Sequence, residues 1–372
     1  MIIEHVAIDV RPGVVMESQS GLQNLRPRIF GALAMPPGGA KVGAILMHPT
    51  SNYMGHYLLT PLAERGVACL ALNSRYVGND GLLEMERVIV DLGAGVAELR
   101  RRGVEKVYLI GNSGGASLAA FYQSQAENLT ATHFVSGEPT HLSADDLPAA
   151  DGIVLSAAHL GRAKIFSEWI DPAVLDEGDP SKVDLELDLY DGPIKPPYSA
   201  DFVQRFKAAQ LARRDRIEAW VEDQAEQLRR TPGAPADKFF LIQRTHADPR
   251  FLDLSLDAND RAAGSVWGDP RVVNLAANAF GRLTSIRAFR SQLSSRSQAR
   301  GPENLAATSV PVLLMEHTAD QSTYPSTREA WKAAAGDRVT HVPVKHGDHY
   351  LVRQPELIAF SADTIADWIR AR

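Results

Sequence analysis

The chain has 372 residues, of which 45% are hydrophobic, 23% charged and 7% aromatic. This is the composition of an ordinary globular protein, and it excludes extensive disorder. The length favours two lobes, or one domain with a large insertion. Lysine and arginine total 39 against 45 aspartate and glutamate, a formal net charge of −6. That balance argues against a protein that mainly coats nucleic acid or an anionic membrane.

The sequence predicts a soluble protein of the cytoplasm. Its single cysteine, Cys69, excludes an internal disulfide and a zinc site built from cysteines, and it lies in the apolar run VACLAL, which is typical of a buried strand. The first residues, MIIEHVAIDV, have neither the cationic segment nor the long apolar segment of a secretory signal. No window approaches the ~20 apolar residues that span a bilayer.

Strands and helices alternate in the first part of the chain. The segment 28–36 is predicted to be a strand that ends in a Pro-Gly turn. A short apolar run bounded by turn residues predicts a buried parallel strand at 43–49, and further strands are predicted at 67–73, 107–111 and 152–158. Helices are predicted between them at 56–64, at 85–99 from an apolar stripe that ends before Gly103, and within 112–122. This alternation is the pattern of a parallel sheet covered by helices on both faces.

The pattern changes between residues 160 and 305. An acid-rich segment, 176–192, predicts a solvated loop, and an apolar stripe predicts a long helix at 200–230. The alternation then returns, with strands predicted at 310–316 and 339–344 and helices at 326–335 and 355–370. We therefore expect an α/β core built from residues 1–159 and 306–372, with a mainly helical lid of residues 160–305 inserted into it.

A glycine-rich turn follows the strand predicted at 107–111 and opens a helix. Its sequence, Gly111-Asn112-Ser113-Gly114-Gly115, fits the G-x-S-x-G turn that lifts a nucleophilic serine out of a sheet. The free N–H groups at the start of the helix would favour negative charge developing beside Ser113. A phosphate-binding turn is the alternative, but the Lys-Ser or Lys-Thr pair of a P-loop is missing.

A serine nucleophile needs a base and a group that orients the base. Candidates for the base are His346 and His349 in KHGDHYL, after the last predicted strand. The candidate acid is Asp320, which follows the strand at 310–316. The chain order Ser, Asp, His is the order of the α/β-hydrolase triad.

These motifs resemble the α/β-hydrolase superfamily, in particular serine hydrolases of the esterase and lipase kind with a large inserted cap. GNSGG matches the nucleophile turn in full. GAILMHP resembles the oxyanion-loop strand, with His48-Pro49 in place of the usual His-Gly, and LNSRYVGND resembles the D-x-R-G-x-G turn. LLMEHTAD resembles the strand that carries the acid, and GDHYL resembles the loop that carries the histidine. The resemblance covers about 43–125 and 308–370.

The resemblance implies an α/β-hydrolase fold with Ser113 as nucleophile, His349 as general base and Asp320 as its orienting carboxylate. It also implies an oxyanion hole made from two backbone N–H groups. One is Gly114, and the other is predicted to be Thr50, because Pro49 has no N–H group to donate.

Several other side chains are candidates for the pocket or for other roles. His346 is the alternative base. His341, His346, His349 and Asp348 could suggest a metal cluster, but their spacing matches no known ligand pattern, and we expect no metal and no cofactor. The lid aromatics Phe166, Trp169, Phe202, Phe206 and Trp220 are interpreted as lid core. The residues predicted to line the substrate pocket are His48, His56, Asn112 and His159.

The expected function is hydrolysis of an ester, thioester or lactone of a sizeable, partly apolar small molecule. An amide substrate, carbon–carbon bond hydrolysis, acyl transfer and ligand binding without turnover remain alternatives. Basic residues of the lid, with Arg162 and Arg213 among them, could hold a substrate carboxylate, although interleaved acids favour plain solvation. We expect no nucleic-acid partner. A homodimer is compatible with the sequence, which carries no signal of oligomeric state.

Overall fold

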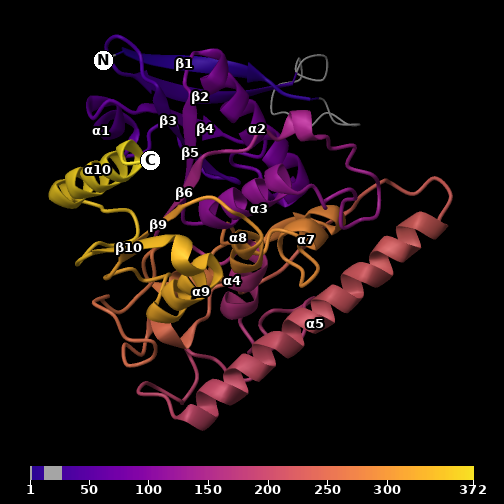
Figure 1. Ribbon diagram of the computed structural model, residues 1–372. Helices are drawn as coiled ribbons and strands as arrows, with labels where there is room; N and C mark the ends of the chain where they lie inside the picture. The colour runs from indigo at the N-terminus through magenta and orange to yellow at the C-terminus, as the bar shows by residue number, and fades with distance from the viewer. Residues whose placement is uncertain (1, 12–26) are drawn as a thin grey trace.

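The computed structural model describes residues 2–11 and 27–372 and is built around one eight-stranded sheet (Figure 1). The strands lie in the order β1-β2-β4-β3-β5-β6-β9-β10. All pairs from β4 to β10 are parallel, whereas β2 pairs antiparallel with both β1 and β4. The strands are β1 (Ile2–Asp9), β2 (Arg28–Met35), β3 (Val42–His48), β4 (Ala68–Asn73), β5 (Lys106–Asn112), β6 (Gly152–Ser156), β9 (Val312–His317) and β10 (Val339–Val344).

Helices cover both faces of the sheet, as the alternating sequence predicts. On one face, α2 (Met85–Arg101), α3 (Gly115–Glu127), α8 (Gly301–Ala306) and α9 (Pro325–Ala335) pack against one set of strand side chains. On the other face, α1 (Leu59–Glu64) and α10 (Pro355–Arg370) pack against the alternate set. Neighbouring residues of β4 show this division, because Leu70 belongs to the first cluster and Cys69 to the second. The predicted burial of Cys69 is confirmed.

The segment 160–305 combines helices with long irregular stretches and forms three smaller hydrophobic clusters of its own. Figure 1 shows α5 running along one side of the molecule, away from the sheet. The last residues of the segment differ, because Ala299 and Leu305 pack in the core cluster with α3 and α9. The elements of this segment are α4 (Arg162–Trp169), α5 (Ala200–Arg230), β7 (Phe239–Leu241), α6 (Pro270–Leu275), β8 (Leu283–Ser285) and α7 (Ile286–Gln292), followed by α8.

The predicted helices at 200–230 and 355–370 and the predicted strand at 339–344 are confirmed by α5, α10 and β10. Strand β1 is absent from the predicted strands. It lies at the edge of the sheet and buries only Val6 and Ile8, so it lacks the continuous apolar run of a strand buried on both faces. The helix predicted at 56–64 begins later, at Leu59.

The prediction of a solvated loop at 176–192 is wrong for one acid. Asp188 is 3% exposed, and its Oδ2 lies 2.8 Å from Nη2 of Arg244, whose guanidinium also contacts Asp171. A buried carboxylate is tolerated there because a buried cation pairs with it. The pairing partner is 56 residues away along the chain, so no local pattern indicates it.

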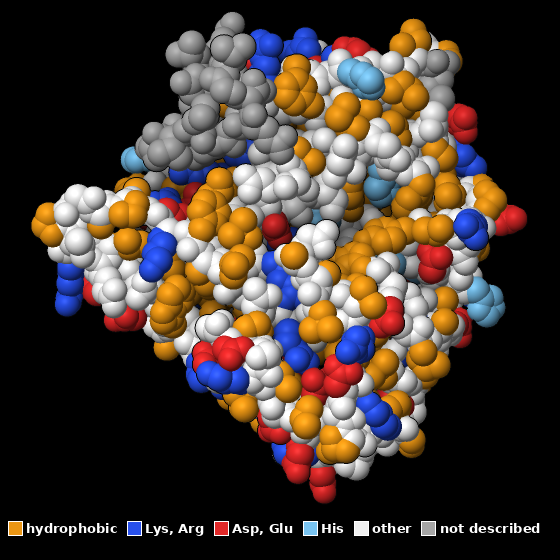
Figure 2. Space-filling view, turned by 180° about the vertical axis from the view of Figure 1, so that it is seen from behind, with side chains coloured by type: hydrophobic (Ala, Val, Ile, Leu, Met, Phe, Trp, Pro, Cys, Tyr) orange, Lys and Arg blue, Asp and Glu red, His pale blue; other side chains and the backbone are white. Residues whose placement is uncertain are grey.

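The surface mixes charges of both signs. On the face seen in Figure 2, basic and acidic side chains are interspersed among hydrophobic ones. Within the described ranges, no helix combines the length and the hydropathy that crossing a bilayer requires.

A buried ion pair ties the loop after β4 to helix α2. The guanidinium of Arg75 places Nη2 2.6 Å and Nε 2.9 Å from Oδ1 of Asp91, and the Arg75 backbone N–H donates to Oδ2 at 2.9 Å. Both side chains are at most 5% exposed. Removing Asp91 would take away the carboxylate that contacts both the guanidinium and the backbone N–H of Arg75 in this buried place.

We expect Asp91→Ala to lower the free energy of unfolding by about 3–5 kcal/mol, because Arg75 would keep its charge in a buried place. Urea denaturation followed by circular dichroism measures the change. The matched control is Glu105→Ala, which breaks the exposed pair of Glu105 with Lys41 and should leave stability unchanged. Equal stability of the two variants would contradict the importance of the buried pair.

Candidate functional site

The turn between β5 and α3 holds Ser113 in a backbone conformation that other residues rarely adopt. The φ angle of Ser113 is +56°, a left-handed value that is strained for a residue with a side chain. Two hydrogen bonds hold the turn in this conformation. The Ser113 N–H donates to the carbonyl of Ser156, and the Ser113 carbonyl accepts from the His159 N–H. This geometry presents the Ser113 hydroxyl at the carboxyl edge of the sheet.

The flanking glycines are required by close approach of neighbouring backbone. A Cβ added at Gly111 would lie 2.5 Å from Cα of Ala116, and one added at Gly115 would lie 2.3 Å from the carbonyl oxygen of Met47. Ala116 belongs to α3 and Met47 to the neighbouring strand β3, so a side chain at either glycine would have to displace backbone.

Ser113, His349 and Asp320 form one chain of hydrogen bonds. Nε2 of His349 lies 3.0 Å from Oγ of Ser113, and Nδ1 lies 2.7 Å from Oδ2 of Asp320. Asp320 follows β9 and His349 follows β10, so three parallel strands bring the residues to one edge. Since an ionised carboxylate only accepts, Nδ1 carries the proton and Nε2 is free to accept the Ser113 hydroxyl proton.

Asp320 is held ionised although it is fully buried. Burial alone would raise the pKa of this carboxyl, but the charge of His349 and the hydrogen bonds from His349 and Thr323 keep the pKa well below its usual value. Ser322 adds a further contact, because its hydroxyl lies 3.0 Å from both Oδ1 of Asp320 and Nδ1 of His349. Ser322 is not among the predicted site residues, and only its position two residues after Asp320 could have indicated it.

The other histidines near this edge do not contact Ser113 in the same way. The side chain of His346 is 81% exposed and lies 3.3 Å from a carboxylate oxygen of Asp260, so the alternative base points away from the serine. A second serine–histidine pair exists, because Oγ of Ser156 lies 3.0 Å from Nε2 of His317. Both members of that pair are at most 2% exposed, whereas Ser113 lines a cavity.

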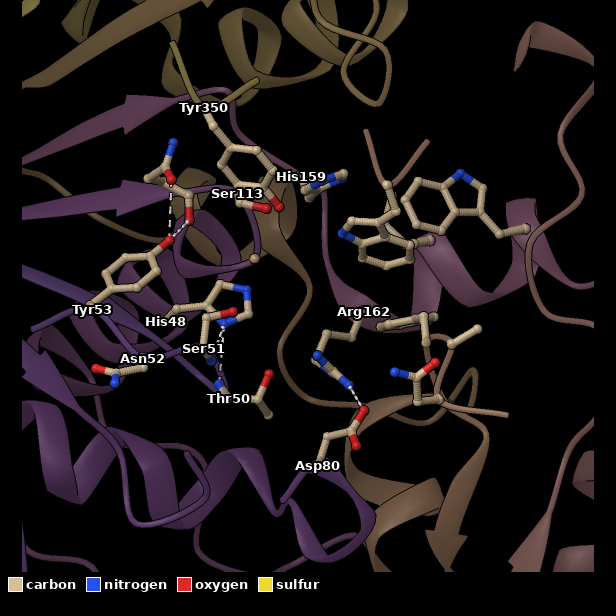
Figure 3. A pocket seen from close by; sticks show the side chains of 18 of the residues that line it. His48, Thr50, Ser51, Asn52, Tyr53, Asp80, Ser113, His159, Arg162 and Tyr350 are labelled. Carbon is tan, nitrogen blue, oxygen red and sulfur yellow. Dashed lines mark hydrogen bonds and ion pairs between the residues drawn. The ribbon is translucent and has the colours of Figure 1, made fainter. Parts of the chain in front are cut away.

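The cavity has a volume of about 960 Å³ and opens beside Ser113 (Figure 3). All four side chains predicted to line a pocket, His48, His56, Asn112 and His159, lie on its wall. Trp169 of α4 lines it as well, and so do five aromatic residues that the sequence does not predict there: Tyr53, Tyr57, Trp267, Phe280 and Tyr350. Trp169 was expected in the lid core. It is 2% exposed and packs on other aromatic rings, but part of it reaches the cavity.

Two of these wall residues are held by hydrogen bonds that build the site. The hydroxyl of Tyr53 donates at 3.0 Å to the backbone carbonyl of Asn112, whose side-chain nitrogen donates to the carbonyl of Ser156.

Burial, followed by the charge of His349, lowers the pKa of His159 to about 3, so its ring stays neutral. Burial lowers the pKa of His56 to about 4, and its Nδ1 accepts from the Leu58 N–H.

The expected second oxyanion donor is engaged elsewhere. The N–H groups of Thr50 and Ser51 donate to Nδ1 of His48, at 3.1 Å and 2.9 Å. Gly114 occupies the N-cap of α3, where backbone N–H groups lack partners within the helix. Thr50 does line the cavity, but its amide is directed to the His48 ring.

The far wall of the cavity carries one buried cation and its partner. Nη2 of Arg162 lies 3.0 Å from Oδ2 of Asp80 (Figure 3). Nε of Arg162 donates at 2.7 Å to the side-chain oxygen of Gln292. The guanidinium carbon also lies 4.6 Å from the centre of the Phe280 ring. The other basic residue named from the sequence, Arg213, is fully buried against Glu177 and does not line the cavity. Within 2–11 and 27–372, no three histidine, cysteine or acidic side chains cluster closely enough to hold a metal ion.

No protein-family model matches the chain, and no curated protein matches it in sequence. Solved structures are similar in fold. Est1E from Butyrivibrio proteoclasticus is 10% identical with a TM-score of 0.50, over 98% of this chain and 99% of its own. DcsB, solved with its substrate analogue, is 14% identical with a TM-score of 0.50, over 99% of both chains. The esterase domain of a Rhodothermus marinus protein is 12% identical with a TM-score of 0.49, over 100% of this chain and 99% of its own. The sheet order, the turn that carries Ser113 and the two neighbours with a TM-score of 0.50 show that the chain has the α/β-hydrolase fold.

Proposed function

We propose that this protein is a serine hydrolase that cleaves a carboxylic ester, thioester or lactone through an acyl-enzyme on Ser113. The observation that carries the proposal is the continuous hydrogen-bonded chain from Ser113 through His349 to Asp320, with the serine end facing the cavity. The strained backbone of Ser113 and the ionised state of Asp320 support it, because both belong to an activated nucleophile.

The chemistry follows from the positions of the protons. Oγ of Ser113 attacks the carbonyl carbon while Nε2 of His349 takes the hydroxyl proton, and the carbonyl electrons move onto oxygen. The tetrahedral intermediate collapses, the bond to the leaving group breaks, and His349 returns the proton to it. Water, deprotonated by His349, then attacks the acyl group, and Ser113 leaves with the proton. Asp320 stabilises the His349 cation in both halves and keeps its ring in the required tautomer.

The cavity supports a substrate of moderate size with both apolar and polar parts. A volume of about 960 Å³ is at the upper end of the range for small-molecule sites. Ile165, Trp169 and Phe280 supply apolar surface, and the Arg162–Asp80 pair supplies hydrogen-bonding groups on the same wall. All of these except Asp80 come from the segment 160–305, which we propose acts as a cap over the site and excludes water from it.

Ser113→Ala is expected to abolish hydrolysis of short p-nitrophenyl esters while the far-ultraviolet circular dichroism spectrum stays unchanged. The matched control is Ser156→Ala, which removes the hydroxyl of the second serine–histidine pair and should retain activity. The measurement is the initial rate of nitrophenolate release with purified proteins. Full activity in Ser113→Ala, or loss of activity in Ser156→Ala alone, would show that Ser113 is not the nucleophile.

His349→Ala is expected to lower kcat by about 10⁴- to 10⁶-fold, because no other group accepts the Ser113 proton. Asp320→Asn should lower kcat by about 10⁴-fold, because an amide favours the wrong tautomer of His349. The control is His346→Ala, an exposed residue of the same loop that should leave the rate unchanged. Steady-state kinetics of the three variants decide between the two histidines, and a larger loss in His346→Ala would reverse the assignment.

A further inference from the structure

The ring of His48 is fixed in one tautomer by the loop that follows β3. Two backbone N–H groups, of Thr50 and Ser51, donate to Nδ1. A ring nitrogen that accepts hydrogen bonds carries no proton, so the proton of the neutral ring is on Nε2. Burial, followed by the positive charge of Arg162, holds the pKa of His48 well below its usual value, and the ring therefore stays neutral. Nε2–H of His48 is consequently a fixed hydrogen-bond donor.

This donor lies beside the nucleophile and faces the cavity. A Cβ added at Gly114 would be only 2.6 Å from Nε2 of His48, which places the ring nitrogen against the backbone of the residue after Ser113. His48 lines the cavity together with Ser113 and Gly114. Figure 3 shows one ring nitrogen bonded to the loop and the other directed into the cavity. Nε2 has no hydrogen-bond partner among residues 2–11 and 27–372.

We propose that Nε2–H of His48 is the second donor of the oxyanion hole, acting with the Gly114 N–H on the oxygen that becomes negative when Ser113 attacks. The proposal rests on the proposed function, because it concerns the same acyl transfer. No proton moves in this step: His48 donates a hydrogen bond that strengthens as the carbonyl oxygen gains charge, and the ring remains neutral.

The arrangement accounts for three sequence features together. Pro49 has no N–H group, so the position after His48 cannot supply a backbone donor. The next two amides, of Thr50 and Ser51, are used to orient the ring. Gly114 leaves the space that the ring needs, since any side chain there would meet Nε2. A side-chain donor thus replaces the backbone donor that the sequence predicts at Thr50.

Two substitutions of His48 separate a donor from a residue that merely holds the loop. In His48→Asn, the side-chain oxygen can replace Nδ1 as acceptor for the Thr50 and Ser51 amides, but no donor reaches the position of Nε2. In His48→Gln, the side-chain nitrogen can replace Nε2 as donor, while the acceptor at Nδ1 is lost. Both variants are compared by kcat for a p-nitrophenyl ester and by the second-order rate of reaction with a fluorophosphonate, whose phosphoryl oxygen occupies the same place.

We expect kcat and the fluorophosphonate rate to fall by about 10²- to 10³-fold in His48→Asn, with little change in KM. His48→Gln should retain a rate closer to that of the wild type. Because His48 stays neutral, the ratio of wild-type to His48→Asn rates should be constant between about pH 6 and pH 9. An unchanged rate in His48→Asn would overturn the proposal. A loss in His48→Gln as large as in His48→Asn would also overturn it and leave His48 as a positioning residue of the loop.

The wild-type reaction keeps this test distinct from the test of the proposed function. If wild-type Ser113 reacts with the fluorophosphonate and His48→Asn reacts equally fast, the donor assignment alone fails. If wild-type Ser113 does not react at all, the proposed function fails, and the donor assignment fails with it. Thermal unfolding of both variants checks that each is folded. If a variant unfolds below the assay temperature, its rates are measured at a lower temperature.

Discussion

The site depends on one geometric constraint, the convergence of the carboxyl ends of parallel strands at a single edge of the sheet. Ser113, Asp320 and His349 are separated by up to 236 residues along the chain, yet each lies in the loop or turn that follows β5, β9 or β10. Parallel pairing from β4 to β10 requires every intervening helix to return the chain to the opposite edge. The two hydrophobic clusters that pack helices on both faces therefore also determine the distances between the reacting groups.

Much of the fold and part of the site could be predicted because the signals are local. Strands buried on both faces are continuous apolar runs, and the turn Gly111–Gly115 combines a strand end, a serine and a helix start in five residues. The choice between His346 and His349 is different, because both follow β10. A left-handed φ of +59° at His346 and its contact with Asp260 turn that side chain outward, which the spacing of the two histidines does not show.

Features that depend on tertiary contacts could not be read from the sequence. Arg162 and Arg213 both belong to the segment 160–305, but only Arg162 lines the cavity. Asp188 is buried because Arg244 meets it from a distant segment. The Thr50 N–H donates to the His48 ring, and this contact depends on how the ring is oriented. The sequence around Pro49 therefore identifies the oxyanion loop but not the group that donates in it. Composition and periodicity describe single elements, whereas these contacts arise only when elements are assembled.

The central claim is that Ser113 is an activated nucleophile, and mapping of a covalent label tests it most directly. Wild-type protein is treated with a fluorophosphonate probe, digested and analysed by peptide mass spectrometry, with the same treatment of His349→Ala. We expect a single label on the peptide that contains Ser113, and its near absence in His349→Ala. Lack of a label on that peptide in folded wild-type protein, or an equal label in His349→Ala, would contradict the account.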